Sequence, residues 1–507
     1  MVTGERINGK VRQKVLANLG RLEELQDGGE LDRLIEALAK FSRNQWIRQQ
    51  ARQLSAEWAK TWGPILIFGR FWKELGLPST FQRLIETTEI ETDFEEATFA
   101  MVLNRVCDPM SKLATREWMK TVYRSEWEEL ELHHLYRALD FLIDHKEEIE
   151  GALYRRVWDL FNLKLDLVLW DTTTTYFEGR AAEGLAEYGY SKDNRPDRVQ
   201  IMIGVLMSRD GFPIAHEVFP GNTAEVDTFR DVLQKVRQKF ALNRVILVAD
   251  RGMVPEKLLK EIEEAGLEYI VGVKMRKLKA MREILTRGGR YHEVSPELKV
   301  KQVVHEGVRY IVCLNVKERE HDHKVREEAV ARLKEKLSQG QFKQLIGNSA
   351  YRRYIKVDGS RASLDEEALK EEAKYDGKYV LRTNTALSPE EVALSYKVLW
   401  QVKRAFRELK SGLDLRPVYH WTEKRIRGHV MVCFLALVLE MALRRKLKEL
   451  GKEVPYEHLL LDLSQLKAVQ LELDGKKYLA RTELMGHADL AFKAVGMRPP
   501  LHVMEVP

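Results

Sequence analysis

Two aspartates that follow short apolar runs are the residues of this 507-residue chain best suited to chemistry. Asp171 follows residues 165–170, and Asp250 follows residues 245–249; both runs have the composition of β-strands. Strand ends in mixed sheets often present catalytic side chains, and carboxylates there suit Mg²⁺ or Mn²⁺. The pair predicts a metal-dependent phosphoryl-transfer site. The alternative for each aspartate is that it only caps the turn that follows.

The charge of the chain is unevenly distributed. The net charge is +6, but residues 397–448 alone contain thirteen Lys and Arg against four acids. Such a basic stretch indicates an anionic polymer partner, with a solvated helix face as the alternative. The three cysteines fit neither a zinc pattern nor a disulfide framework. The longest apolar run, residues 431–439, is too short to span a bilayer and predicts a buried helix, so we expect no membrane partner.

Apolar periodicity predicts a mainly helical N-terminal third. A β-like run follows a turn at Asn8-Gly9, and helical patterns then cover residues 31–59, 65–75 and most of 94–149. From about residue 163 the pattern alternates. We expect strands at 165–170, 200–207, 214–219, 245–249 and 269–273, a hairpin at 208–211, and helices at 226–240 and 255–265.

Residues 274–375 break this alternation and indicate an insertion. Strand-like runs cover 299–304 and 308–316, and a charged helical stretch covers 318–337. After a strand at 377–383, Ser388 with Glu391 forms a capping-box signature that predicts a helix over 389–411. A second helix is expected over 423–450.

Several phrases of the chain together resemble one known family. They are Asp171-Thr172-Thr173-Thr174, residues 189–197, Pro220-Gly221-Asn222-Thr223, residues 248–253, and residues 396–420 with Gly428-His429. The chain resembles an insertion-sequence DDE transposase. The implied fold is α/β, an RNase H-like mixed sheet core with a β-rich insertion and helical N-terminal and C-terminal regions. The implied regions of the chain are a mainly helical N-terminal region that binds the DNA ends (1–160), the first part of the catalytic core (161–274), an inserted subdomain (275–375), the completion of the core with basic helices (376–450) and a C-terminal extension (451–507).

The last catalytic helix of that family has the pattern Tyr, two residues, Arg, three residues, Glu, six residues, Lys. Tyr396 and Lys410 match it, but Leu399 and Lys403 stand at the Arg and Glu positions. A charged lysine has no lone pair for a cation and repels it. Glu408 is the low-ranking substitute acid, because five helical residues place it about 140° around the axis from Lys403.

The resemblance implies that Asp171 and Asp250 hold Mg²⁺ or Mn²⁺. It also implies double-stranded DNA partners, namely terminal inverted repeats and target DNA, a dimer in the synaptic complex, and a cytoplasmic, nucleoid-associated location in a bacterium or archaeon. Trp400, Tyr419 and Trp421 would stack on exposed bases, although helix packing explains Trp400 equally well. Tyr396 would contact DNA or support the active-site helix. The expected phosphate contacts, with a solvated loop as the alternative for the last two, are Arg404, Arg407, Lys410, Arg416, Lys424, Arg425, Arg427, Lys192 and Arg195.

The expected activity is that of a transposase, which cleaves transposon ends and joins a 3′-hydroxyl to target DNA. Two alternatives stay open on the sequence. One is a catalytically impaired DNA-binding relative, which Lys403 favours. The other is a metal-dependent DNA nuclease that does not join strands.

Overall fold

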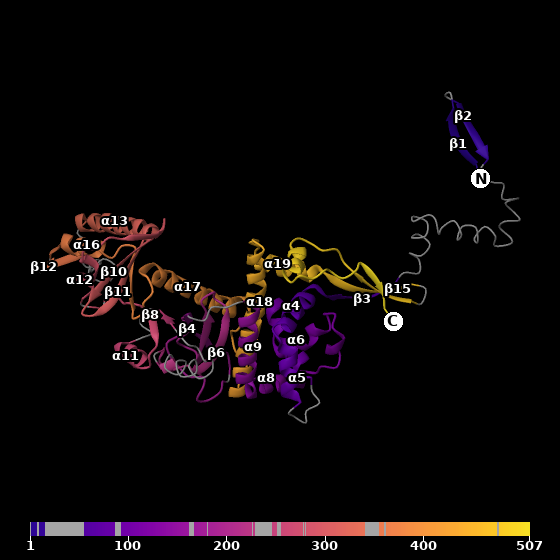
Figure 1. Ribbon diagram of the computed structural model, residues 1–507, viewed down its shortest axis with the longest axis horizontal. Coiled ribbons are helices and arrows are strands. Elements are labelled where there is room, and N and C mark those ends of the chain that lie inside the picture. Colours follow the sequence, from indigo (N-terminus) through magenta and orange to yellow (C-terminus); the bar gives the residue numbers. More distant parts are fainter. Residues whose placement is uncertain are drawn as a thin grey trace.

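The structure is a computed structural model of the whole chain (Figure 1). It describes residues 2–7, 10–15, 55–86, 93–161, 167–179, 181–225, 227–228, 246–250, 255–276, 278, 280–339, 354–358, 361–473 and 476–506. The predicted turn at residues 8–9, residues 31–54 of the predicted helix 31–59 and nearly all of the predicted helix 226–240 lie outside these ranges.

A mixed sheet forms the centre of one half of the molecule. Within the described ranges it has nine strands, in the spatial order β6 (Pro213–Pro220), β5 (Gln200–Ser208), β4 (Leu167–Tyr176), β7 (Ile246–Ala249), β8 (Glu268–Gly272), β14 (Lys378–Thr383), β11 (Val308–Asn315), β10 (Leu298–His305) and β9 (His292–Ser295). β4, β5 and β6 are antiparallel, as predicted, whereas β4, β7 and β8 run parallel.

Both faces of this sheet are covered, which explains the unbroken apolar run of β5. Ile203 and Val205 pack with α17 (Pro389–Arg407) in one core, and Met202 and Leu206 pack with α11 (Glu256–Glu264) in another. Every residue of β5 is buried. A strand buried on both faces has no polar alternation, so its sequence reads as continuous hydrophobic residues.

The insertion extends the same sheet. β9, β10 and β11 form an antiparallel meander whose last strand pairs with β14, and β14 in turn pairs with β8. The predicted strands 299–304 and 308–316 are confirmed as β10 and β11, and the charged helix 318–337 is confirmed as α13 (Val316–Ser338). The remaining elements here are α12 (Met281–Thr286), the hairpin of β12 (Ile355–Asp358) and β13 (Arg361–Leu364), and α16 (Glu366–Ala373).

The other half of the molecule is mainly helical, as the sequence predicts. Its elements are α4 (Gly63–Glu74), α5 (Leu77–Ile85), α6 (Phe94–Cys107), α7 (Lys112–Met119), the 3₁₀ turn η1 (Ser125–Trp127), α8 (Leu132–Asp144) and α9 (Lys146–Phe161). A hairpin of β1 (Val2–Ile7) and β2 (Lys10–Val15) begins the chain. The predicted helix 31–59 is wrong over its last residues, because Ser55–Thr61 form strand β3.

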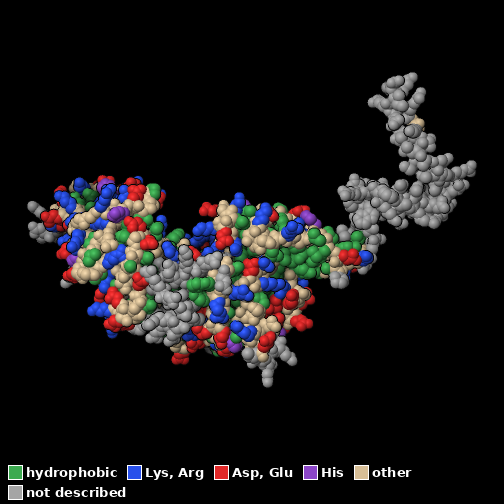
Figure 2. Space-filling view, viewed as in Figure 1, with side chains coloured by type: hydrophobic (Ala, Val, Ile, Leu, Met, Phe, Trp, Pro, Cys, Tyr) green, Lys and Arg blue, Asp and Glu red, His purple; other side chains and the backbone are tan. Residues whose placement is uncertain are grey.

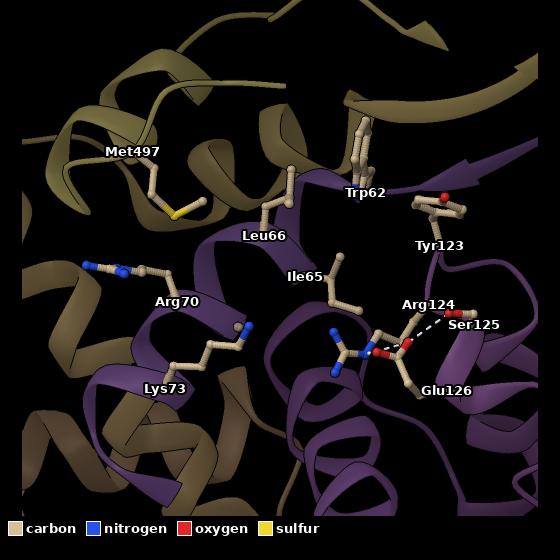
Figure 3. A pocket seen from close by; sticks show the side chains of 11 residues that line it. Trp62, Ile65, Leu66, Arg70, Lys73, Tyr123, Arg124, Ser125, Glu126 and Met497 are labelled. Atoms are coloured by element: carbon tan, nitrogen blue, oxygen red, sulfur yellow. Dashed lines mark hydrogen bonds and ion pairs between the residues drawn. The ribbon is translucent and has the colours of Figure 1, made fainter. Parts of the chain in front are cut away.

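The partner of β3 comes from the other end of the chain. β3 pairs with β15 (Lys467–Leu473), which continues to β16 (Lys476–Arg481) and β17 (Val503–Glu505). The C-terminal segment also contains α19 (Tyr456–Gln465) and α20 (Ala488–Ala494), which pack on α4. A cavity of about 400 Å³ opens beside this junction, and its lining includes Arg70 and Lys73 of α4 and Met497 (Figure 3). The C-terminal extension is thus part of the helical half.

A long helix, α18 (Glu423–Glu449), joins the two halves (Figure 1). It packs against α6 and α8 on one side and against β6 on the other. The apolar run at residues 431–439 is fully buried, as predicted. Helix α18 is long and apolar enough to cross a membrane by composition, but 89% of its apolar window is buried inside the protein.

Candidate functional site

Asp171 lies in the middle of β4. The strand continues for five residues beyond it, through Thr172 to Tyr176, and Asp171 pairs with Val205 of β5. The prediction that a strand ends at Asp171 is therefore wrong. The threonines that suggested a turn are β-branched residues, which are also favoured in a paired strand.

Strand register places Asp250 beside Asp171. β4 and β7 are parallel, with Leu167 opposite Ile246 and Leu169 opposite Val248. Continuing that register by two residues brings the two aspartates opposite each other, about 5 Å apart across neighbouring strands. β7 ends at Ala249, so Asp250 leaves the sheet at this point and is partly exposed.

Helix α17 supplies two side chains to Asp250. The Tyr396 hydroxyl donates to Oδ1 at 2.9 Å, and Lys403 Nζ donates to Oδ2 at 2.5 Å. The two residues are seven apart, or two helical turns, so they project from the same side of the helix. Lys403, which stands where the family pattern places the third acid, therefore faces the aspartate pair as an ion-pair partner.

The sequence fixes how α17 lies on the sheet. Ser388 and Glu391 form the predicted capping box, with Pro389 in the first turn. Leu399, Val402 and Phe406 are buried against the sheet. The predicted helix 389–411 ends as an α-helix at Arg407 and continues as one π-helical turn, η2 (Glu408–Gly412).

The carboxyl group of Asp171 has a raised pKa. Its side chain is only 7% exposed, and this burial raises its pKa to about 6. The charge of Lys192, the Thr172 backbone N–H at 2.8 Å and the charge of Lys403 act in the opposite direction, whereas Asp250 raises the pKa further. Desolvation therefore outweighs two nearby cations.

Lys192 is the second cation of the site. Its ammonium donates to the Thr172 carbonyl at 2.7 Å and to the Thr172 hydroxyl at 3.0 Å, and it pairs with Glu225 at 2.5 Å. Glu225 also accepts a hydrogen bond from the Thr172 hydroxyl at 3.2 Å. Sequence reasoning missed Glu225, although it lies just after the Pro220–Thr223 phrase.

Glu408, the substitute acid, forms ion pairs with two arginines. Its partners are Arg404 at 3.9 Å and Arg444 at 3.4 Å. Arg444 also pairs with Glu440 at 2.6 Å, and burial raises the pKa of Glu440 to about 7. The structure does not bring Glu408 to the aspartate pair, in agreement with its angular position on the helix.

Asp193, which the sequence did not single out, organises two of the expected phosphate contacts. Its carboxylate is 4% exposed and accepts from Lys410 at 2.7 Å and from Arg416 at 2.5 Å. Burial lowers the pKa of Lys410, while Asp193 opposes that shift. These two cations are therefore bound internally in the protein without DNA.

Most of the other predicted phosphate contacts have an acidic or aromatic partner. Arg407 lies over the Trp400 ring, and Arg195 lies over the Tyr176 ring and pairs with Asp197. Among the cations of α18, Lys424 pairs with Asp144, Arg425 with Asp140 and Arg427 with Glu423. Trp400, Tyr419 and Trp421, the predicted stacking residues, are all exposed. Figure 2 shows Lys and Arg side chains beside the hollow between the insertion and the helical half.

The residues at this site do not make a complete two-metal set. Two carboxylates can hold one Mg²⁺ with water completing its shell. Lys403, however, places an ammonium on Asp250, where a cation would have to bind. Within the described residues, no group of three His, Cys, Asp or Glu side chains is arranged to hold a metal ion. Among the described residues, the ammonium of Lys403 stands beside the two aspartates.

Comparisons with known proteins agree on one family. A family model described as "Transposase DDE domain" matches residues 164–439, and a model described as "IS1634 family transposase, N-terminal domain" matches residues 1–52. A search of curated proteins gave no match. Among solved structures, the chain is similar to the piggyBac transposase synaptic complex with hairpin DNA, with 11% identity, 79% of each chain covered and a TM-score of 0.36. It is also similar to the Mos1 transposase paired-end complex with the left transposon end, with 12% identity, 36% of this chain and 60% of that chain covered, and a TM-score of 0.16.

Proposed function

The chain belongs to the DDE transposase family and is a DNA transposase, and on that premise we propose that it cleaves and joins the ends of an insertion sequence, recognised by their terminal inverted repeats, at a metal site that Lys403 impairs. Asp171 and Asp250 are the two acids that remain of the catalytic set. Members of this family generally use divalent metal ions. In this chain, Lys403 limits cleavage and strand joining, because its ammonium competes with a cation for Asp250.

The ion pair between Lys403 and Asp250 is the observation that carries this proposal. Magnesium binds through carboxylate oxygens, and an ammonium 2.5 Å from one of those oxygens repels it at short range. Tyr396 occupies the other oxygen of Asp250. A cation would therefore have to displace Lys403 before Asp250 is available to it.

The partners of the proposed function are double-stranded DNA at the transposon ends and at the target. The basic side chains of α17 and α18 support this choice, because phosphate contacts position DNA without reading its sequence. The match of residues 1–52 to an insertion-sequence N-terminal domain supports a role of that segment in binding the ends. Handling two ends together calls for a dimer in the synaptic complex, acting in the cytoplasm on nucleoid DNA.

The test is a cleavage and strand-joining assay on linear DNA that carries the terminal repeats, with Mg²⁺ or Mn²⁺. We expect weak activity from the wild type and at least a tenfold increase from Lys403→Glu, since one well-placed catalytic group is typically worth about 10²–10³ in rate. Asp171→Asn and Asp250→Asn in the Lys403→Glu background should abolish the gain.

Three outcomes separate the rival functions. Robust cleavage by the wild type that Lys403→Glu does not increase contradicts the impaired site. Cleavage without joining indicates a nuclease outside transposition. Specific binding of the repeats with no cleavage by either protein indicates a DNA-binding relative that has lost more than the third acid.

A further inference from the structure

The exchange of an acid for a lysine changes how the site meets DNA, as well as how it meets a metal ion. Three clustered carboxylates repel the phosphates of DNA unless bound cations neutralise them. We propose that Lys403 supplies this neutralising charge from within the protein, so that DNA phosphate binds beside Asp171 and Asp250 without a divalent cation. The inference rests on the proposed function in one respect, namely that DNA is the ligand.

The geometry of Lys403 allows it to contact both Asp250 and a ligand. An ammonium has three N–H donors. Lys403 uses one of them in its hydrogen bond to Asp250 Oδ2. The Lys403 side chain is 50% exposed, whereas that of Asp250 is 26% exposed. The remaining donors can therefore reach a phosphate oxygen while the ion pair stays in place.

Lys192 brings a second ammonium group to the site. Lys192 and Lys403 both lie close enough to Asp171 to act on its charge. Lys192 is fixed by Thr172 and Glu225, so it does not need a ligand to hold it. Arg404, the next residue of α17, is 53% exposed. A phosphate group at this edge of the sheet would meet ammonium groups that already balance part of the negative charge of the carboxylates.

The expected effect on binding follows from the charge. Replacing Lys403 by Glu changes the site by two charge units, and would restore the three-acid pattern of the family. At about 6 Å from a phosphate and at an effective dielectric of about 40 to 80, this corresponds to a loss of roughly 10-fold to 100-fold in affinity. A divalent cation would offset most of that loss.

The experiment measures the affinity of the full-length protein for a repeat-end duplex by fluorescence anisotropy. Each protein is titrated in EDTA and in Mg²⁺ or Mn²⁺, at matched ionic strength, because all phosphate contacts depend on salt. We expect the wild-type Kd to agree within about twofold between the two conditions. Lys403→Glu should bind at least tenfold more weakly in EDTA and recover with the metal, and Lys403→Gln should lie between them.

The matched control is Lys493→Glu. Lys493 forms an ion pair with Asp489 at 2.5 Å in α20 and is also largely exposed, so this variant makes the same change in net charge away from the site. It should keep the wild-type response to metal, apart from a small uniform loss of affinity. Circular dichroism melting curves establish that each variant is folded before it is compared.

Each result bears on the inference. A wild-type Kd that rises tenfold or more in EDTA overturns it, while recognition of the repeats by the proposed function stands, since specific binding is still observed. Equal behaviour of Lys403→Glu and Lys493→Glu overturns it as well, because Lys403 then makes no special contact. A wild type that does not distinguish repeat ends from random DNA under any condition refutes the proposed function, and this inference with it.

Discussion

Asp171→Asn should make the protein more stable at neutral pH. The pKa of Asp171 is about 6 in the folded protein, against about 3.9 in an unfolded chain. The native state therefore binds more protons than the unfolded state between these values, and stability falls as pH rises through that window. Each pKa unit is worth about 1.36 kcal/mol, so the buried carboxylate lowers stability by about 3 kcal/mol at pH 8. A neutral asparagine of the same shape removes that cost.

The same reasoning sets the pH dependence of the effect. At pH 5 most of the native Asp171 is already protonated, so the gain from Asp171→Asn should shrink to about 1.5 kcal/mol. Urea unfolding of both proteins at pH 5 and pH 8, in EDTA, measures this difference. Asp197→Asn is the control, because Asp197 is exposed and Arg195 lowers its pKa, so its neutralisation should bring no gain at either pH. A variant no more stable than wild type at pH 8, or a gain that does not depend on pH, refutes the argument.

Two further predictions concern the groups around the pair. Asp193→Asn should destabilise the protein by about 3 kcal/mol, because Lys410 and Arg416 would lose the carboxylate that neutralises them; thermal unfolding of the variant checks this, and an unchanged Tm contradicts it. Replacing both Tyr419 and Trp421, which are 68% and 65% exposed, by alanine should weaken binding to DNA with unpaired ends by at least tenfold, since stacking is worth about 1–3 kcal/mol per base. Binding to blunt duplex should change less, and an equal loss on both DNAs excludes stacking on unpaired bases.

Local sequence patterns predict an element well when the features that form it lie within its own segment of the chain. The strand at 200–207 was recognisable because β5 is buried on both faces, and the helix beginning at Pro389 because its capping box is local. The end of β4 was misjudged, since Thr172 to Thr175 suit a turn as well as a strand. β3 was missed because its partner β15 lies more than 400 residues along the chain, and no local pattern contains that pairing.

The site shows the same division between local and long-range information. Asp171, Asp250 and the unusual Lys403 could be found from the sequence, because the resemblance fixes their positions along the chain. The ion pair of Lys403 with Asp250 depends on how α17 lies across β4 and β7, which only the fold determines. The partnerships of Glu225 with Lys192 and of Asp193 with Lys410 also join distant segments, so no spacing rule could have identified them.

Direct titration of Mn²⁺ into the protein, by calorimetry or by the loss of its free electron paramagnetic resonance signal, tests the central claim about Lys403 most simply. The wild type should bind Mn²⁺ only weakly, because the ammonium of Lys403 holds Asp250. Lys403→Glu should bind Mn²⁺ at least tenfold more tightly, and Asp171→Asn or Asp250→Asn should remove that gain. A wild-type protein that binds Mn²⁺ as tightly as Lys403→Glu, and loses that binding with Asp250→Asn, would contradict the account.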